Sequence, residues 1–241
     1  MRALFFLFAI VVLSMHVGFA SASDIGVTPV AVHLDKSNDR ATVSVVNSGS
    51  DPVIMQVEAV EWKAGAPADR DTPTADMVIN PSVFTVQPGQ SQLVRVGLRR
   101  AAQADHEGTY RIVMREVPAA PRPGEVRISG QVRVLMALRV PIYVAPQNVV
   151  RESRWQATQA HDGSIVASVQ NEGNVHVRVG KIQLRSSEGV PVGAEQGAAV
   201  VLAGDSQKFR LRGATADKRP LTLDIVTDTG TQSVAVVTAL R

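Results

Sequence analysis

The sequence predicts an all-β protein made of two similar β-sandwiches. Short apolar runs of alternating pattern recur about every ten positions between turn residues, which is the pattern of a sandwich. The composition is rich in Val and contains only 4% aromatic residues, and β-branched residues favour strands over helices. Two stretches of the first half recur in the second half in the same order. The apolar runs of the first half show no helical 3.6-residue period.

The N-terminus predicts a cleaved secretory signal at residues 1–22. Met1-Arg2 precedes an apolar run from Ala3 to Met15, and Ala20-Ser21-Ala22 has the small-x-small form that signal peptidase cleaves. The run is shorter than the about 20 apolar residues of a membrane span, and no later segment approaches that length. We therefore expect an exported chain that starts at Ser23 and has no stable membrane insertion.

Cysteine content and net charge limit the classes of protein to which the chain can belong. The chain has no cysteine, so the exported protein must be stabilised by core burial without disulfides. The formal net charge is +3, and no run of basic residues supports binding to nucleic acid.

Five alternating runs in the first half predict strands. The first contains Val30, Val32 and Leu34, and turns at residues 47–51 and 87–90 separate later runs. The five runs cover residues 25–35, 40–47, 52–62, 91–99 and 109–118.

A sixth strand is predicted at residues 130–146, after a Pro-rich loop, and its pattern differs from the others. One face is apolar throughout, and the other is half apolar. The apolar face holds Val132, Val134, Met136, Leu138 and Val140, and the other face holds Arg133, Leu135, Ala137 and Arg139. Such a strand could bury both faces inside its own sandwich, or it could keep one face for a partner.

Two stretches of the second half that resemble stretches of the first half predict a second sandwich. Residues 45–62 resemble residues 169–184, and residues 86–96 resemble residues 201–211. The matched pairs are Asn47 and Asn171, Gly49 and Gly173, Gly89 and Gly204, Ser91 and Ser206, Gln92 and Gln207, and Arg95 and Arg210. We expect domains at residues 23–146 and 147–241, held at a fixed angle by a short linker at residues 145–150.

The sequence offers no constellation for catalysis. The histidines are His16, His33, His106, His161 and His176, and none of them lie at metal-ligand spacing. A nucleophile elbow, a phosphate-binding Gly loop and a two-cysteine redox pair are absent. The loop with Asp69, Asp71 and Asp76 lacks the Gly and terminal Glu of a hand-type calcium loop, so we interpret it as solvated. We expect no enzyme activity, no cofactor and no metal, and an exposed strand edge is then the simplest route to binding.

Several stretches together resemble the periplasmic pilus-assembly chaperones of the chaperone–usher pathway, above all their archaic-type branch. The resemblance rests on residues 47–62, 80–99, 107–118 and 136–146, with weaker support from residues 169–179 and 201–211. It implies two immunoglobulin-like domains in a boomerang arrangement. It also implies donor-strand complementation, in which the chaperone inserts a strand into a pilin subunit that lacks its own final strand.

The resemblance implies a donor strand at residues 126–145. Alignment on Pro146 places Val132, Val134 and Met136 at the positions whose side chains enter the groove of the subunit, and Ile128 could extend the series. One face of the strand would then belong to the chaperone, and the other would be kept for the client.

The resemblance also implies an ionic cluster at the domain junction, formed by Arg95, Glu116 and Asp228. Such a cluster would fix the angle between the domains more than it would add stability. Arg95 and Glu116 could instead be solvated strand residues.

The sequence departs from the family where the C-terminal carboxylate of the subunit is held. Classical members use an Arg in the first strand and a Lys in the donor strand, and here those positions hold Ala31 and Pro141. Arg139 is the candidate anchor, with Arg111 or Arg115 as further options.

We therefore expect a periplasmic chaperone that captures pilin-like subunits and delivers them to an outer-membrane usher. The alternative is a secreted immunoglobulin-like adhesion or surface-binding module, and a third class, an exported hydrolase, lacks its catalytic groups. The sequence leaves open which subunit or fibre is served and whether unloaded chains self-associate.

Overall fold

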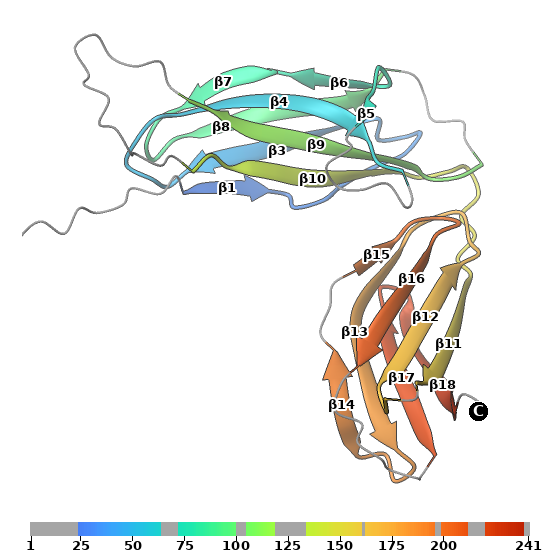
Figure 1. The fold of residues 1–241 in the computed structure, drawn as a ribbon. Coiled ribbons are helices and arrows are strands. Elements are labelled where there is room, and N and C mark those ends of the chain that lie inside the picture. The colour runs from blue at the N-terminus through green and yellow to red at the C-terminus, as the bar shows by residue number, and fades with distance from the viewer. Residues whose placement is uncertain are drawn as a thin grey trace, which may run out of the picture.

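The computed structural model describes residues 24–63, 72–99, 105–118, 134–160, 162–195, 199–211 and 220–238. The regular secondary structure of these residues consists of β-strands. The strands form two domains that meet as the arms of an L (Figure 1). The all-β prediction is therefore confirmed. Within the described ranges no helix is long and apolar enough to cross a membrane. The predicted signal at residues 1–22 lies outside them.

The strands divide between the domains at the segment that contains the expected linker. The N-terminal domain holds β1 (Ile25–Thr28), β2 (Val32–Leu34), β3 (Arg40–Asn47), β4 (Val53–Glu61), β5 (Thr72–Pro73), β6 (Met77–Asn80), β7 (Val83–Val86), β8 (Ser91–Leu98), β9 (Gly108–Val117) and β10 (Ala137–Val144). The C-terminal domain holds β11 (Ser153–Gln159), β12 (Ile165–Asn171), β13 (Val177–Ser186), β14 (Pro191–Glu195), β15 (Ala199–Val201), β16 (Ser206–Leu211), β17 (Leu221–Thr227) and β18 (Gly230–Thr238).

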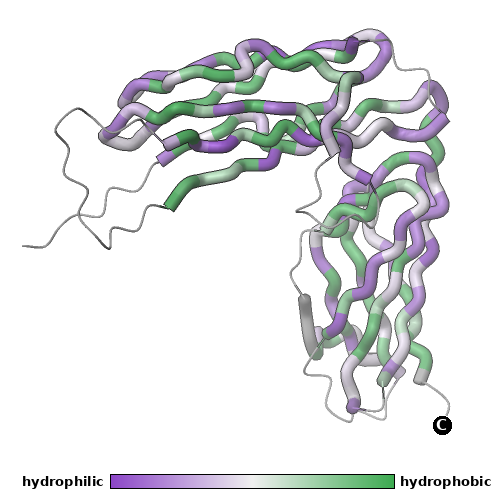
Figure 2. The backbone as a smooth tube through the Cα atoms, turned by 45° about the horizontal axis from the view of Figure 1, so that its top comes forward, coloured by the Kyte–Doolittle hydropathy of each residue, from purple (hydrophilic) through white to green (hydrophobic). Residues whose placement is uncertain are grey.

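Two sheets of the N-terminal domain enclose one core. One sheet has the order β1-β3-β8-β6, and the other has the order β2-β10-β9-β4-β5 with β7 also paired to β4. The core includes Met55, Ile112, Met114 and Ile142, all fully buried. Hydropathy alternates along these strands (Figure 2), because each strand has one face toward the core and one away from it.

The predicted strand at residues 25–35 is in fact two strands in different sheets. β1 pairs antiparallel with β3, with Ile25 opposite Asn47. β2 pairs parallel with β10, with Val32 opposite Ile142. Pro29 lies between the two strands and has no N–H to give to a ladder, so the chain can leave one sheet there and cross to the other.

The C-terminal domain repeats the sandwich with its own core. Its strand order is β14-β13-β17-β18-β11-β12-β16, and β15 also pairs with β13. Ile165, Leu184, Leu223 and Ile225 are fully buried between the layers.

A buried asparagine organises one end of the N-terminal sandwich. The Nδ2 group of Asn47 donates to the carbonyl oxygens of Asp51 at 2.8 Å and Val86 at 2.9 Å. Its Oδ1 atom accepts a hydrogen bond of 3.0 Å from the N–H of Gly49. The carbonyl oxygen of Asn47 accepts a further bond of 2.8 Å from Gly89, which has a φ of 71° that favours glycine.

The same arrangement recurs in the C-terminal domain. Asn171 donates to the carbonyl oxygens of Val175 at 2.8 Å and Val201 at 3.0 Å, and it accepts from the N–H of Gly173 at 3.1 Å. Gly204, with a φ of 75°, donates to the carbonyl oxygen of Asn171 at 3.0 Å. The predicted pairs Asn47/Asn171 and Gly89/Gly204 therefore occupy equivalent places in two copies of one turn.

Candidate functional site

One edge of β10 is open over most of its length. Residues 137–144 of β10 pair with β9 on one side. On the other side, β2 pairs only with residues 142–144. Residues 137–141 therefore have no second strand partner among the described residues. Open edges expose N–H and C=O groups that can pair with another chain.

The side chains of β10 alternate between the core and the outer face of its sheet. Val140, Ile142 and Val144 are buried in the core of the domain, and Leu138 packs against it. Ala137 and Arg139 lie exposed on the other face.

The residues before β10 remain accessible. Val134 is 83% exposed, and Met136 is half-buried, with its carbonyl oxygen bound to the N–H of Glu116 at 2.9 Å. Ile128 and Val132, the other predicted donor residues, lie outside the described part of the chain.

The parity of the strand corrects one expectation. Val134 and Met136 share the parity of Leu138 and Val140, which face the domain's own core. A division in which one face serves the chaperone and the other the client therefore does not hold. On this one face, the side chain of Val134 is exposed and the side chain of Val140 is buried.

Three arginines lie on the outer face of the sheet beside the open edge. Arg111 and Arg115 lie on the same face of β9, and Arg139 lies on that face in the neighbouring strand β10. Arg115 forms an ion pair with Glu58 of β4. The guanidinium of Arg111 lies 3.9 Å from the ring centre of Trp62, a cation–π contact. This face therefore carries basic groups next to the open edge.

Four rings gather where the two domains meet. Tyr143 stacks on His176 of the C-terminal domain with ring centres 3.7 Å apart. His33 lies 5.3 Å from Tyr143, and Trp62 lies 6.2 Å from it. Burial raises the pKa of Tyr143 to about 12, with Glu107 adding to the effect, so its hydroxyl stays protonated at neutral pH.

A buried hydrogen-bonded pair of side chains crosses the junction beside these rings. Glu107, just before β9, and His176 have side chains that are 6% and 11% exposed. The His176 Nδ1 atom lies 2.8 Å from Glu107 Oε2, and the His176 backbone N–H donates to the same oxygen at 2.9 Å. A carboxylate of one domain is thus satisfied by groups of the other.

Asn174 joins the linker to both domains. Its Nδ2 group donates to the carbonyl oxygens of Asp105 and Asn148, each at 2.7 Å. Its Oδ1 atom accepts from the N–H of Val150 at 2.7 Å. Its own carbonyl oxygen accepts from the N–H of Glu107 at 2.8 Å. These bonds tie the loop after β12 to the linker and to the N-terminal domain.

Residues 24–150, which hold β1 to β10 and the linker, match the family described as "Pili and flagellar-assembly chaperone, PapD N-terminal domain". The chain belongs to this family of pilus-assembly chaperones. The predicted family membership is confirmed. No curated protein sequence matches the chain significantly.

Solved structures of pilus chaperones share the two-domain fold of this one. A chain of the CsuC–CsuE chaperone–subunit complex from the archaic Csu pili of Acinetobacter baumannii is 14% identical, with a TM-score of 0.62, and the match covers 90% of this chaperone and 100% of that chain. The CupB2 chaperone of Pseudomonas aeruginosa is 16% identical, with a TM-score of 0.57 and coverages of 88% and 100%. A chain of the SafA pilin–SafB chaperone complex of Salmonella enterica is 16% identical, with a TM-score of 0.60 and coverages of 90% and 98%.

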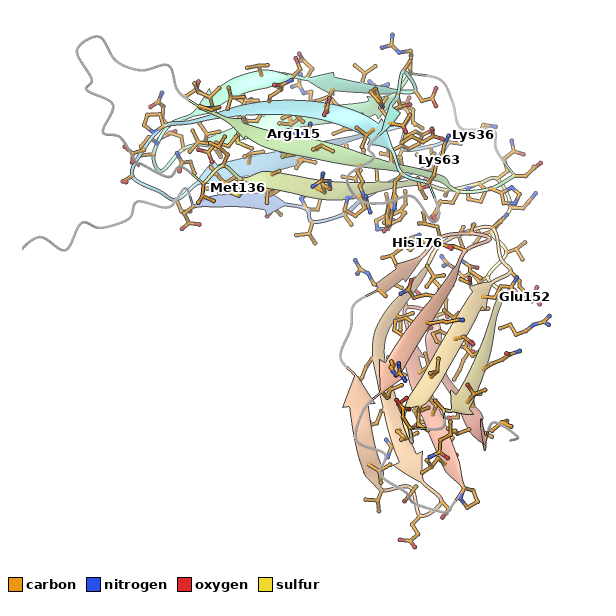
Figure 3. The ribbon with its side chains drawn as sticks, in the orientation of Figure 1. Lys36, Lys63, Arg115, Met136, Glu152 and His176 are labelled. Carbon is orange, nitrogen blue, oxygen red and sulfur yellow. The ribbon has the colours of Figure 1, made fainter. Side chains whose placement is uncertain are left out.

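The structure does not assemble the predicted ionic cluster of this chaperone. Glu116 contacts Met136, which lies at the end of the N-terminal domain remote from His176 (Figure 3). Asp228 lies at the junction, where its Oδ1 atom accepts from the N–H of Arg178 at 3.1 Å.

The physical reason is the length of β9. An extended strand rises about 3.3 Å per residue, so Glu116 lies roughly 30 Å along the chain from Glu107. Arg95 is exposed on β8, between Thr42 and Asn80 of the neighbouring strands. The junction of this chaperone therefore uses Glu107 and His176 instead. Sequence reasoning missed this pair because its members are 69 positions apart and no local pattern links them.

The two positions that depart from the family lie near the arginine face. Pro141 is directly opposite Arg111 in the register of β10 and β9. Ala31 precedes β2 and is half-buried. Arg139 lies two residues before Pro141 on the same face of β10. Arg111 and Arg139 thus lie beside Pro141 on this face of the sheet.

The acidic loop considered as a calcium site lies partly outside the described part of the chain. Asp69 and Asp71 lie outside the described ranges, and Asp76 accepts a hydrogen bond of 3.2 Å from the Tyr110 hydroxyl. Across the parts of the chaperone that are described, no three His, Cys, Asp or Glu side chains gather closely enough to hold a metal ion.

Proposed function

We propose that this chain is a periplasmic chaperone that captures pilin-like subunits through the open edge of β10 and the segment before it, and delivers them to an outer-membrane usher. The family supports chaperone activity in pilus assembly. The complexes of CsuC with CsuE and of SafB with SafA show that solved proteins of this fold are found with pilus subunits.

The observation that carries the proposal is an exposed apolar segment that runs into an unpaired strand edge. Val134 is 83% exposed immediately before β10. Its complete burial in a client would contribute about 1.5–3 kcal/mol. Each main-chain hydrogen bond along residues 137–141 would contribute about 0.5–1.5 kcal/mol more. Such a sum suits a complex that holds a client and can still release it.

The proposal predicts that a charge in the donor segment abolishes capture. Val134→Asp and Met136→Asp place a carboxylate where an apolar groove must cover it, and an unpaired buried charge is costly. We expect each variant to lower the recovery of a co-expressed, tagged pilin-like subunit from periplasmic extract at least about tenfold, a loss of about 1.4 kcal/mol or more.

Leu93→Asp is the matched control, because Leu93 is 55% exposed on β8, in the opposite sheet of the same domain. It should leave capture unchanged. Circular dichroism must show that all three variants fold. Normal capture by folded Val134→Asp and Met136→Asp, or loss of folding in both, would count against donation of this strand.

Arg139 is the proposed anchor for the C-terminal carboxylate of the subunit, and its loss predicts weaker capture. A charge-assisted hydrogen bond is worth about 1.5–3 kcal/mol, so Arg139→Ala should lower capture about tenfold or more. The same assay on Arg111→Ala tests the arginine opposite Pro141. Arg154→Ala, an exposed arginine of the C-terminal domain paired with Glu172, is the control. If Arg139→Ala captures normally, Arg139 is not the anchor, and a loss in Arg111→Ala would assign the role to that residue.

A further inference from the structure

The contact between the domains is built from ionisable rings. Tyr143 of β10 lies between His33 of β2 and His176 of the C-terminal domain, with ring centres 5.3 Å and 3.7 Å away. The two imidazoles are 6.3 Å apart. Free imidazoles gain a positive charge near pH 6.5. Two imidazoles, which carry the same charge when protonated, thus flank the Tyr143 ring at the domain boundary.

Charged groups of both signs surround this stack. Glu107 contacts His176 directly, and Asp228 also faces Tyr143. Arg178 and Arg111 face the same ring, and Arg151 lies 4.0 Å from Asp228. Asp228 thus has an arginine beside it, while the partner of Glu107 is His176. A proton on His33 would add a positive charge that Glu107 favours and that Arg178 and His176 of the C-terminal domain oppose.

The surroundings of His33 already oppose its charged form. Burial lowers the pKa of His33 below its usual 6.5, and His176 and Arg178 lower it further, against an opposing effect of Glu107. The side chain of His33 keeps an exposed edge, so water screens these interactions and the effect is moderate. Separation of the domains would remove His176 and Arg178 from His33 and leave Glu107 in the same domain beside it.

We propose that His33, Tyr143 and His176 form a proton-sensitive contact that holds the two domains at their angle and weakens in acid. It concerns the chain alone, without a client, and does not rest on the proposed capture of subunits.

The direction follows from proton binding. The separated state binds the His33 proton more tightly than the closed state does, so acid favours separation. The contribution of His33 to the closed contact is complete above about pH 6.5 and is lost as the pH falls through the window below that value. Each unit of difference in pKa between the states changes the closed-to-separated ratio up to about tenfold.

The angle between the domains can be followed directly, because the natural chain has no cysteine. Ser91→Cys and Ser206→Cys provide labelling sites at equivalent exposed positions of the two domains. Single-molecule energy transfer between dyes at these sites, at about pH 7.5 and about pH 5 and constant ionic strength, reports the separated population. We expect that population to rise several-fold, up to about tenfold, in acid.

His33→Gln should remove most of this response, because glutamine cannot gain a proton in this range. His106→Gln is the matched control, since His106 is exposed in the loop before β9 and outside the ring stack. Circular dichroism at both pH values must show intact sheets. An unchanged transfer distribution in the unsubstituted chain, a full response in His33→Gln, or loss of the sheets in acid would each overturn the inference.

Discussion

Replacement of Asn171 by alanine is expected to lower the free energy of unfolding of the C-terminal domain by about 3–5 kcal/mol. The substitution leaves the carbonyl oxygens of Val175 and Val201 and the N–H of Gly173 without their side-chain partner. An unsatisfied buried polar group costs about 1–3 kcal/mol. Chemical denaturation followed by the fluorescence of Trp155, which lies in the core of this domain, measures the loss.

Two companion measurements test this expectation. Asn47→Ala should destabilise the N-terminal domain instead, because Asn47 makes the equivalent bonds there. Gln170→Ala is the control, since Gln170 is the exposed neighbour of Asn171 on β12. If Asn171→Ala is no less stable than Gln170→Ala, the buried amide does not hold the turn.

Replacement of Gly173 by valine is expected to displace the linker. A Cβ atom at Gly173 would lie 2.4 Å from the carbonyl oxygen of Val150 and 2.8 Å from the backbone nitrogen of Glu152. Both neighbours are backbone atoms, so the linker itself must move, and the bond from the Gly173 N–H to the Glu152 carbonyl oxygen at 2.9 Å would be lost. We expect a destabilisation of about 3–5 kcal/mol from overpacking and lost hydrogen bonds together.

The displacement should be visible as a changed distance between dyes on the two domains, together with a lower melting temperature. Gly26→Val is the matched control, because a Cβ atom at Gly26 in β1 meets nothing within 4 Å. A Gly173→Val variant with the unsubstituted distance and melting temperature would show that the linker does not need this close approach.

The layers of the fold could be predicted from the sequence because each sandwich strand has one core face. The alternation of apolar and polar residues indicates which face that is. The match of Asn47 with Asn171 indicates the second sandwich, because both side chains make the same hydrogen bonds in their turns. The sheet switch at Pro29 was not predicted, since alternation continues through it while the hydrogen-bond partners change.

The site could be predicted only in part, for a related reason. The pattern of residues 130–146 shows which side chains share a face, but not which layer covers each of them. Val134 and Val140 have the same parity, and one is 83% exposed while the other is 5% exposed. The junction depends on contacts between loops far apart in sequence, so neither Glu107 nor Asn174 carried a local signal.

The bonds of Asn174 have a consequence for how far this protein can vary. The groups that it binds are all main-chain atoms: the carbonyl oxygens of Asp105 and Asn148, which every residue supplies, and the N–H of Val150, which every residue except proline supplies. Side chains at those three positions can therefore be exchanged without removing a single partner of the amide. This part of the junction therefore depends on one asparagine and on no other side chain.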